Sequence, residues 1–363
     1  MNLNQIIQGD VLDCLKDVPD QSVQCVVTSP PYWGLRDYGT ATWEGGDKDC
    51  NHFRDNQVSK SCTTGHIKSQ KNGGVADSIY KKVCKKCGAI RKDKQLGLES
   101  SPEEFVDNLV KVFREVKRVL KDDGTLWLNL GDSYYRSGSD QPTQRGLLNT
   151  EDINQRYGFD KKHKKSHDVL KSKDLIGIPW KVAFALQADG WYLRQDIIWH
   201  KPNPMPESVK DRCTKSHEYI FLLSKSERYF YNADAIRTNS EYKVVVPSGW
   251  DTDKGTHKSV HRRGRGEGKS TNKTESGANK RSVWKINTYS FKDAHFATFP
   301  PELPELCIKA GSKENDVVLD PFFGSGTTGW VAQRLGRKWL GIELNPEYIK
   351  IAEKRFLQQE LFM

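Results

Sequence analysis

Residues 317–345 combine a glycine-rich turn with an acidic residue about twenty positions further along the chain. A short apolar stretch leads into Asp320-Pro321-Phe322-Phe323-Gly324-Ser325-Gly326-Thr327-Thr328, and a second apolar stretch ends at Glu343. Gly324 and Gly326 allow a tight turn, and the helix expected after them directs free N–H groups into the crevice. A carboxylate at the end of the neighbouring strand can accept hydrogen bonds from ribose hydroxyls. The pattern predicts a site for a nucleoside-containing cofactor, and the missing Gly-Lys-Ser/Thr excludes a phosphate-binding NTPase loop.

A second motif, Ser29-Pro30-Pro31-Tyr32, follows the β-branched run at 23–28. The prolines have no backbone N–H, so the Ser29 hydroxyl and the neighbouring carbonyls present hydrogen-bond acceptors at the rim of the expected sheet. Tyr32 adds a flat aromatic face. Acceptors beside a ring suit an exocyclic amine whose heterocycle is stacked. Taken alone, however, Pro-Pro-Tyr is better explained as a stiffened turn after a strand.

Cysteine and histidine spacing indicates a metal site. Cys50-x-His52 and Cys84-x-x-Cys87-Gly form two ligand pairs in a polar stretch with few aliphatic residues. Such pairs suit tetrahedral zinc, and the metal would replace the core that the segment lacks. Cys62 and His66 are an alternative to Cys50 and His52, and free surface thiols are the alternative to a metal site. Four protein ligands would leave no open position, so we expect a structural role.

The elements that must position these residues alternate between strands and helices. Apolar runs at 4–8, 23–28, 125–130, 191–200, 218–223, 317–319 and 339–342 indicate strands. Helices are expected near 101–122, 178–189, 301–310, 328–335 and 346–358, where Ser-Pro-Glu-Glu marks the start of the first. Alternation of this kind predicts an α/β fold with a mainly parallel sheet.

Composition narrows the class of protein. The 363 residues include 57 Lys and Arg against 47 Asp and Glu, a formal net charge of +10, and 36% are hydrophobic. No apolar run approaches the roughly 20 residues of a membrane helix, and no secretory signal is visible at the start of the sequence. Eight cysteines are too sparse for a disulfide scaffold and fit a cytoplasmic protein.

The positive charge is confined to three segments. Residues 48–94 carry +8, 156–174 carry +4 and 254–281 carry +7, which leaves −9 on the rest of the chain. Basic segments of this kind favour a polyanionic partner such as nucleic acid, although solvated loops explain any one of them equally well.

The two motifs together resemble those of the DNA amino-methyltransferases, which transfer a methyl group from S-adenosylmethionine to an exocyclic base nitrogen. Ser29–Tyr32 matches the family's (D/N/S)-P-P-(Y/F/W) motif, and Asp320–Thr328 matches D-P-F-x-G-x-G-T-T. Further resemblances are 124–133 (GTLWLNLGDS), 199–203 (WHKPN) and 295–301 (HFATFPP). The catalytic motif precedes the cofactor motif, with a variable region between them, as in the permuted β class.

The resemblance implies a Rossmann-like methyltransferase fold and a role for each matched residue. Asp320 to Thr327 would surround the methionine part of S-adenosylmethionine and Glu343 its ribose. Asp10 would contact the adenine amine, and Phe296 and Thr298 would belong to the motif that closes over the cofactor. Ser29, Pro30, Pro31 and Tyr32 would form the catalytic loop, with Tyr32 stacked on a base flipped out of double-stranded DNA.

The resemblance also leaves alternatives open. Serine at the first motif position resembles the cytosine-N4 subgroup more than the adenine-N6 subgroup. Methylation of a protein glutamine also uses a Pro-Pro-Tyr loop, but with the opposite motif order. A DNA-binding module without catalysis is the non-enzyme alternative.

The predicted organisation has three kinds of segment. Residues 1–47, 95–203 and 295–363 form the catalytic core, with a basic loop at 136–174. Residues 48–94 form a Lys-rich, zinc-ribbon-like insertion, and 204–294 form a target-recognition region.

Overall fold

The structure is a computed structural model that describes residues 1–34, 40–52, 83–135, 169–238, 278–288 and 298–360. Within these parts, an eight-stranded sheet has the order β1-β10-β9-β2-β5-β7-β6-β8. The first five strands in this order, β1, β10, β9, β2 and β5, are mutually parallel, whereas β7 pairs antiparallel with both β5 and β6. The prediction of an α/β fold with a mainly parallel sheet is therefore confirmed.

Seven of the eight strands of this sheet overlap the apolar runs of the sequence, and β8 was not expected. The bounds of the strands are β1 Gln5–Gln8, β2 Val23–Thr28, β5 Leu120–Leu130, β6 Tyr192–His200, β7 His217–Ser224, β8 Val283–Lys285, β9 Val317–Asp320 and β10 Lys338–Glu343. Strand β5 begins at Leu120, directly after the helix α2 (Pro102–Val119) ends, whereas the helix was expected to continue to residue 122. All six residues of β2 are buried, as expected for a parallel strand covered on both faces.

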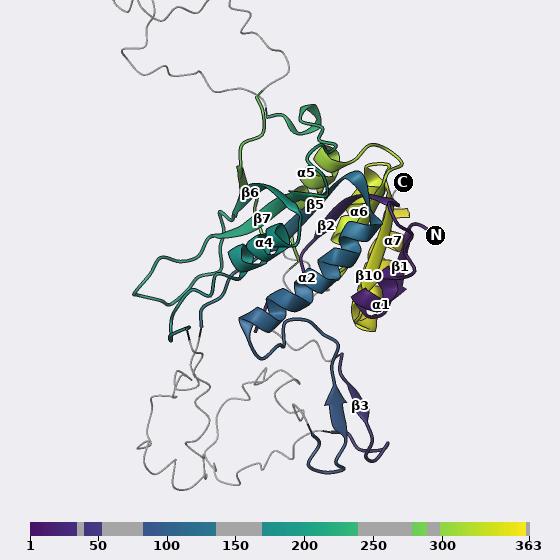
Figure 1. Cartoon of the computed structure of the whole chain (residues 1–363), viewed down its shortest axis with the longest axis vertical. Coiled ribbons are helices and arrows are strands. Elements are labelled where there is room, and N and C mark those ends of the chain that lie inside the picture. Colours follow the sequence, from purple (N-terminus) through teal and green to yellow (C-terminus); the bar gives the residue numbers. More distant parts are fainter. Residues whose placement is uncertain (35–39, 53–82, 136–168, 239–277, 289–297, 361–363) are drawn as a thin grey trace, which may run out of the picture.

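Helices cover both faces of the sheet. One core cluster packs α1 (Val11–Leu15), α2 (Pro102–Val119) and α4 (Ile178–Ala188) against one face. A second cluster packs α5 (Glu302–Gly311), α6 (Thr327–Arg334) and α7 (Pro346–Glu360) against the other. Figure 1 shows α2 and α4 in front of the sheet.

Local sequence explains where the longest helix begins. Ser101 Oγ accepts a hydrogen bond from the backbone N–H of Glu104 at 3.2 Å, and Pro102 occupies the first turn. Phe105, Leu109 and Val112 lie on the buried face of α2 at helical spacing. These contacts anchor the helix that lies beside the middle of the sheet.

A two-stranded hairpin stands outside the main sheet. Its strands are β3 (Thr42–Glu44) and β4 (Ile90–Lys92), which pair antiparallel. Figure 1 shows β3 near the bottom of the view, projecting away from the core. The hairpin includes the described part of the predicted zinc-ribbon-like insertion; Cys62 and His66 lie outside the described residues.

The predicted target-recognition region contributes to the core. Strand β7 lies between β5 and β6, and β8 pairs with the outer side of β6. Recognition by residues 204–294 stays a prediction, and residues 239–277, which include most of its basic segment, are outside the described residues. None of the described helices combines the length and apolar character needed to cross a bilayer.

Candidate active site

The carboxyl ends of four parallel strands bring the two motifs together. β1 and β2 end just before Gly9 and Ser29, and β9 and β10 end at Asp320 and Glu343. Because these strands are parallel, all four ends lie at one edge of the sheet, where ligands bind in open α/β sheets.

A cavity of about 450 Å³ lies at this edge. Its lining includes most of the residues predicted from sequence, namely Asp10, Ser29, Pro30, Pro31, Tyr32, Thr298, Asp320, Pro321, Phe322, Gly324, Ser325, Thr327 and Glu343. Gly326 is not in the lining, and Phe296 lies outside the described residues. The structure thus places both motifs around one cavity.

Asp320 is buried and joined to two threonines. Thr28 Oγ1 donates to Asp320 Oδ1 at 2.6 Å, and Thr328 Oγ1 donates to Oδ2 at 2.7 Å. Burial raises the pKa of the Asp320 carboxyl to about 6, although these hydroxyl groups favour its ionised form. The carboxyl therefore fixes the end of β9 against the end of β2.

Glu343 holds the glycine-rich turn. Its Oε2 accepts a hydrogen bond from the Gly324 N–H at 2.7 Å, and its Oε1 accepts one from the Asn345 N–H at 2.8 Å. Burial raises the pKa of Glu343 above its usual value. Gly324 has φ +51° with open space where a side chain would be, so the backbone here is accessible to a ligand.

Two further groups, in the half of the cavity that contains the glycine-rich turn, offer hydrogen bonds. Asp10 caps α1 through Oδ1, which accepts from the Leu12 and Asp13 N–H groups. Ser325 Oγ is buried without a hydrogen-bond partner among the described residues. A buried hydroxyl without a partner in a cavity wall fits a polar ligand that would complete its bonding. Gly326 (φ +79°) packs against Ala352, so its visible role is in the turn.

Tyr32 lies in the other half of the cavity. Its hydroxyl is 2.8 Å from Glu218 Oε2, 3.3 Å from Asn129 Oδ1 and 3.5 Å from Ser29 Oγ. Burial and the charge of Glu218 raise the pKa of Tyr32 well above its usual value. The phenol is therefore a hydrogen-bond donor rather than a phenolate.

Glu218, Lys201 and Asn129 also line the cavity, but sequence reasoning assigned them no role. A charged residue near the start of the otherwise apolar strand β7 was the available signal, since buried charges need partners. Gln95 and Leu96, which follow the hairpin, also line the cavity. Their position depends on how the hairpin docks on the core, and they belong to no sequence motif.

The residues after β4 directly contact the loop that contains Ser29–Tyr32. The Gly34 N–H donates to the Gly97 carbonyl at 2.8 Å, and Trp33 Nε1 donates to the Glu99 carbonyl at 3.1 Å. A Cβ on Gly97 would lie 2.9 Å from the Tyr32 carbonyl oxygen. The hairpin is thus continuous with one wall of the cavity.

The predicted metal ligands converge at the end of this hairpin. The ligand atoms of Cys50, His52, Cys84 and Cys87 all lie within 4.8 Å of one another. Cys50 Sγ is 3.7 Å from Cys84 Sγ, and Cys87 Sγ is 3.6 Å from His52 Nδ1. With Zn–S bonds of about 2.3 Å, two thiolates of a tetrahedral site lie about 3.8 Å apart. The donor set and its spacing therefore fit a tetrahedral zinc ion.

Backbone geometry supports the same arrangement. The Gly88 N–H donates to the Cys84 carbonyl, and the Cys84 N–H donates to the Ala89 carbonyl, each at 2.8 Å. Gly88 has φ +77°, which glycine adopts without steric cost. This tight turn holds the two sulfur atoms of the Cys-x-x-Cys pair on the same side.

Comparison with known proteins identifies relatives along almost the whole chain. The profile of a family described as DNA methylase, which covers N6 and N4 methyltransferases, matches residues 23–354. The Type II methyltransferase M.Cfr9I of Citrobacter freundii is 41% identical, with 98% of this chain and 88% of the relative covered. The Type II methyltransferase M.SmaI of Serratia marcescens is 40% identical, with 98% and 91% covered.

A solved structure has the same fold. The PvuII DNA methyltransferase, described as cytosine-N4-specific, matches with a TM-score of 0.55 and 18% identity over 98% of this chain and 87% of its own. The expected Rossmann-like methyltransferase fold is thereby confirmed. From the profile match and the sequence relatives together, we conclude that the chain belongs to the N6/N4 DNA methylase family and is a DNA methyltransferase.

Proposed function

We propose that the protein transfers a methyl group from S-adenosylmethionine to the N4 amine of a cytosine in double-stranded DNA. The observation that carries the proposal is the shared cavity, in which Ser29–Tyr32 faces the Asp320–Glu343 site. The hydrogen bond from Thr28 to Asp320 fixes the two motifs at one distance from each other. A methyl donor and a base amine held in this cavity would be close together, which is the main requirement of such a transfer.

The cofactor half of the cavity suits S-adenosylmethionine chemically. Glu343 can accept hydrogen bonds from ribose hydroxyls, as an acid at the end of this strand does in nucleoside sites. Ser325 Oγ and the turn around Gly324 would meet the methionine part, and Asp10 would accept from the adenine amine. Thr298 also lines the cavity and would lie over the cofactor, with Phe296 expected nearby. When bound, S-adenosylmethionine supplies a methyl group on a positively charged sulfur.

The catalytic half would activate the amine. The lone pair of an exocyclic amine is delocalised into its ring, which makes the amine a poor nucleophile. Pro31 has no backbone N–H, so the Pro30–Pro31 peptide group presents only an acceptor to the amine. The Ser29 hydroxyl oxygen and the Pro30 carbonyl can accept the two amine hydrogens. That bonding localises the lone pair on nitrogen through preorganised dipoles. The Tyr32 ring would contact the flipped base.

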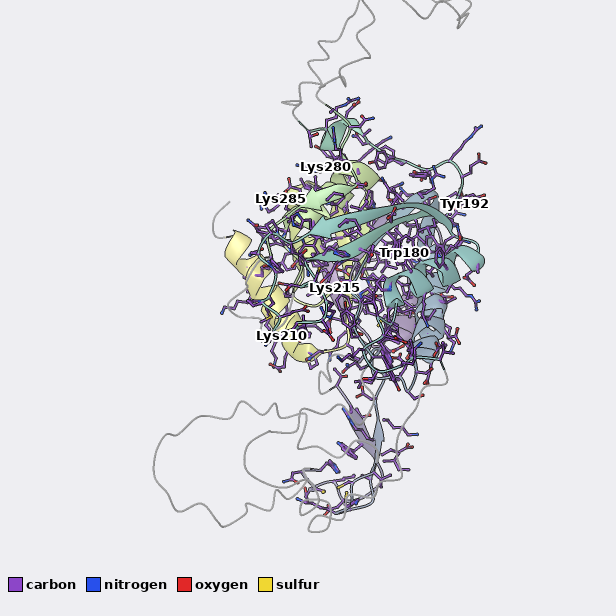
Figure 2. The ribbon with its side chains drawn as sticks, turned by 90° about the vertical axis from the view of Figure 1, so that its left-hand side faces the viewer. Trp180, Tyr192, Lys210, Lys215, Lys280 and Lys285 are labelled. Carbon is purple, nitrogen blue, oxygen red and sulfur yellow. The ribbon has the colours of Figure 1, made fainter. Side chains whose placement is uncertain are left out.

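Basic residues beside β6–β8 support a DNA partner. Figure 2 labels Lys210 and Lys215 from the segment before β7, and Lys280 and Lys285 from the segment around β8, along one side of the molecule. Lys210 and Lys285 are exposed. Lys215 donates to the Asp132 carbonyl at 3.2 Å and so also serves the fold. Lysines of this kind contact phosphates and position the duplex without reading its sequence.

One experiment distinguishes the modified base. Purified protein is incubated with DNA and S-adenosylmethionine, and the DNA is digested to nucleosides for mass spectrometry. We expect N4-methylcytosine, with the yield reduced at least tenfold in Ser29→Ala. N6-methyladenine as the sole product would show the adenine alternative instead. The family includes both classes, and serine at position 29 is what favours cytosine.

We also propose that Cys50, His52, Cys84 and Cys87 bind one structural zinc ion. Strand β4 is only three residues long, and of the three only Arg91 is partly buried. A hairpin this small gains little from burial, so metal bonds would supply most of its stability. All four ligand positions are filled by protein atoms, which excludes an open site for catalysis by the metal.

Zinc content gives a direct test. Metal analysis of the purified protein is expected to find one zinc per chain, and Cys84→Ser/Cys87→Ser is expected to contain none. Cys213→Ser is the matched control, because Cys213 is an exposed thiol outside the cluster, and it should retain the metal. Wild-type protein without zinc, or zinc retained in the double variant, would contradict this ligand set.

A further inference from the structure

Glu218 is a carboxylate in the cavity wall with three donors from three different segments. Tyr32 OH donates to its Oε2 at 2.8 Å, Asn129 Nδ2 donates to the same oxygen at 3.2 Å, and Lys201 Nζ pairs with Oε1. The Glu218 side chain is 16% exposed and the Lys201 side chain 19%. A mostly buried acid with this many partners holds one fixed position.

Each partner is itself held in place. Asn129 is buried and also donates to the Tyr219 carbonyl at 3.1 Å. Lys201 Nζ lies 4.3 Å from the centre of the Trp199 ring. The group therefore spans the ends of β5, β6 and β7, beside the end of β2. Lys201 already neutralises the charge of Glu218. The acid therefore does not need the hydrogen bond from Tyr32 to compensate its burial.

The Tyr32 hydroxyl has one hydrogen and several neighbours. Glu218 is both nearer than Asn129 Oδ1, at 2.8 Å against 3.3 Å, and negatively charged, so the hydrogen is directed to Glu218. The phenol oxygen then accepts from the Ser29 hydroxyl and the Gly131 backbone N–H. A Cβ on Gly131 would lie 2.5 Å from the ring, so the ring edge is in close contact with the backbone there.

This bonding has a consequence for Ser29. If the Ser29 hydroxyl hydrogen is directed to the Tyr32 oxygen, the lone pairs of Ser29 Oγ face elsewhere and are free to accept. An acceptor is what an amine with two N–H groups requires. The orientation of the Tyr32 phenol thus sets the plane of the ring that contacts the base. It also determines that the Ser29 hydroxyl acts as an acceptor toward the amine.

We propose that Glu218 is a positioning residue for methyl transfer, which acts by fixing the hydroxyl and ring of Tyr32 with the help of Lys201 and Asn129. The inference rests on the proposed function, because it concerns the amine-binding half of the same cavity. Glu218 contacts no part of the glycine-rich turn through any hydrogen bond that the structure describes, so cofactor affinity is expected to be independent of it.

A double-mutant cycle tests this path. Glu218→Gln keeps an acceptor for Tyr32 but removes the charge, whereas Glu218→Ala removes both, and Tyr32→Phe removes the hydroxyl. We expect Glu218→Ala to lower the single-turnover rate about 100-fold and Glu218→Gln to lower it less, because a misplaced group of this kind costs about that factor. In the Tyr32→Phe background, Glu218→Ala is expected to lower the rate by no more than about threefold.

Other readouts separate positioning from loss of structure. The affinity for S-adenosylmethionine, measured by calorimetry, should change less than twofold in each variant. Protein labelled with 3-fluorotyrosine should show a shifted Tyr32 fluorine resonance in Glu218→Gln, with the resonance assigned by its loss in Tyr32→Phe. Glu227→Gln, an exposed acid in the loop after β7, is the matched control and should retain the wild-type rate.

The outcomes distinguish failure of this inference from failure of the proposed function. Wild-type protein that transfers no methyl group to DNA would contradict the proposed function. Full activity in Glu218→Ala, or an equal loss in the presence and absence of the Tyr32 hydroxyl, would overturn the positioning role of Glu218. The second result would mean that the acid contacts the base directly.

Discussion

Thr28 and Asp320 are 292 positions apart in the sequence, yet Thr28 Oγ1 lies 2.6 Å from Asp320 Oδ1. The first residue ends the strand before the Ser29–Tyr32 loop, and the second ends the strand before the glycine-rich turn. Both are buried, with exposures of 1% and 2%. This buried hydrogen bond therefore links the two halves of the cavity.

Removal of that hydroxyl should affect the pH dependence of the reaction. Thr28→Val keeps the shape but removes a donor that favours the ionised form of Asp320, so the pKa of Asp320, about 6 in the wild type, should rise. We expect the acid limb of the rate–pH profile to move to higher pH and the rate at pH 7 to fall several-fold. Thr28→Ser keeps the hydroxyl and should leave the limb in place. An unchanged profile in Thr28→Val would contradict the proposed link.

Asp320 should also make folding depend on pH. Its pKa is about 6 in the folded protein against 3.8 for an ordinary aspartate, so the folded state takes up the proton first as the pH falls. The stabilisation is fully present below about pH 4 and is lost as the pH rises through 6, and it amounts to roughly 3 kcal/mol for two pH units. Urea unfolding between pH 4 and pH 7 should show this change in the wild type relative to Asp320→Asn. A constant difference between the two proteins would contradict it.

Glu343 should determine cofactor affinity more than stability. Glu343→Ala removes the acceptor for the Gly324 and Asn345 N–H groups and the acceptor proposed for the ribose. Loss of such a charged hydrogen bond costs about 1.5–3 kcal/mol, which corresponds to a roughly 10- to 150-fold weaker affinity for S-adenosylmethionine. Calorimetric titration measures the change. Glu347→Gln, an exposed acid in the first turn of α7, is the control and should bind as the wild type does.

Gly97 offers a test of the contact between the hairpin and the catalytic loop. Gly97→Ala would place a Cβ 2.9 Å from the Tyr32 carbonyl oxygen at φ +94°, so the loop would have to move. We expect the transfer rate to fall at least tenfold, whereas affinity for the cofactor falls much less. Gly177→Ala is the control for backbone strain, because Gly177 has φ +78° with nothing within 4 Å of the added carbon. Equal rates in the two variants would show that strain alone explains the effect.

The sequence predicts the sheet and the cofactor turn well because both depend on local patterns. The buried run of β2 and the Ser101 cap of α2 are visible as apolar spacing and helix-start residues. The predicted metal ligands Cys50 and His52 converge with Cys84 and Cys87 as their spacing indicates, although sequence alone could not choose them over Cys62 and His66.

The contacts that cross between segments are what the sequence could not predict. The bond from Tyr32 to Glu218 depends on the antiparallel register of β5, β7 and β6, in which Asn129 faces Ile220 and Trp199 faces Glu218. The docking of Gly97 on the catalytic loop depends on where the hairpin returns to the core. Neither has a periodic pattern or a motif, so both become visible only in three dimensions.

The pairing of β1 with β10 would allow the order of the strands along the chain to be changed without a change in which strands are neighbours. These strands come from opposite ends of the described chain but are adjacent and parallel, with Gln5 opposite Leu340 and Gln8 opposite Glu343. A gene that starts within 239–277 and joins α7 to β1 by a linker would encode the same strand neighbours in a new order. Its product would present the glycine-rich turn before the Ser29–Tyr32 loop. Such a circular permutant should fold to the same sheet, because β1 is already adjacent to the C-terminal strand β10, so a linker from α7 to β1 would join elements that lie together.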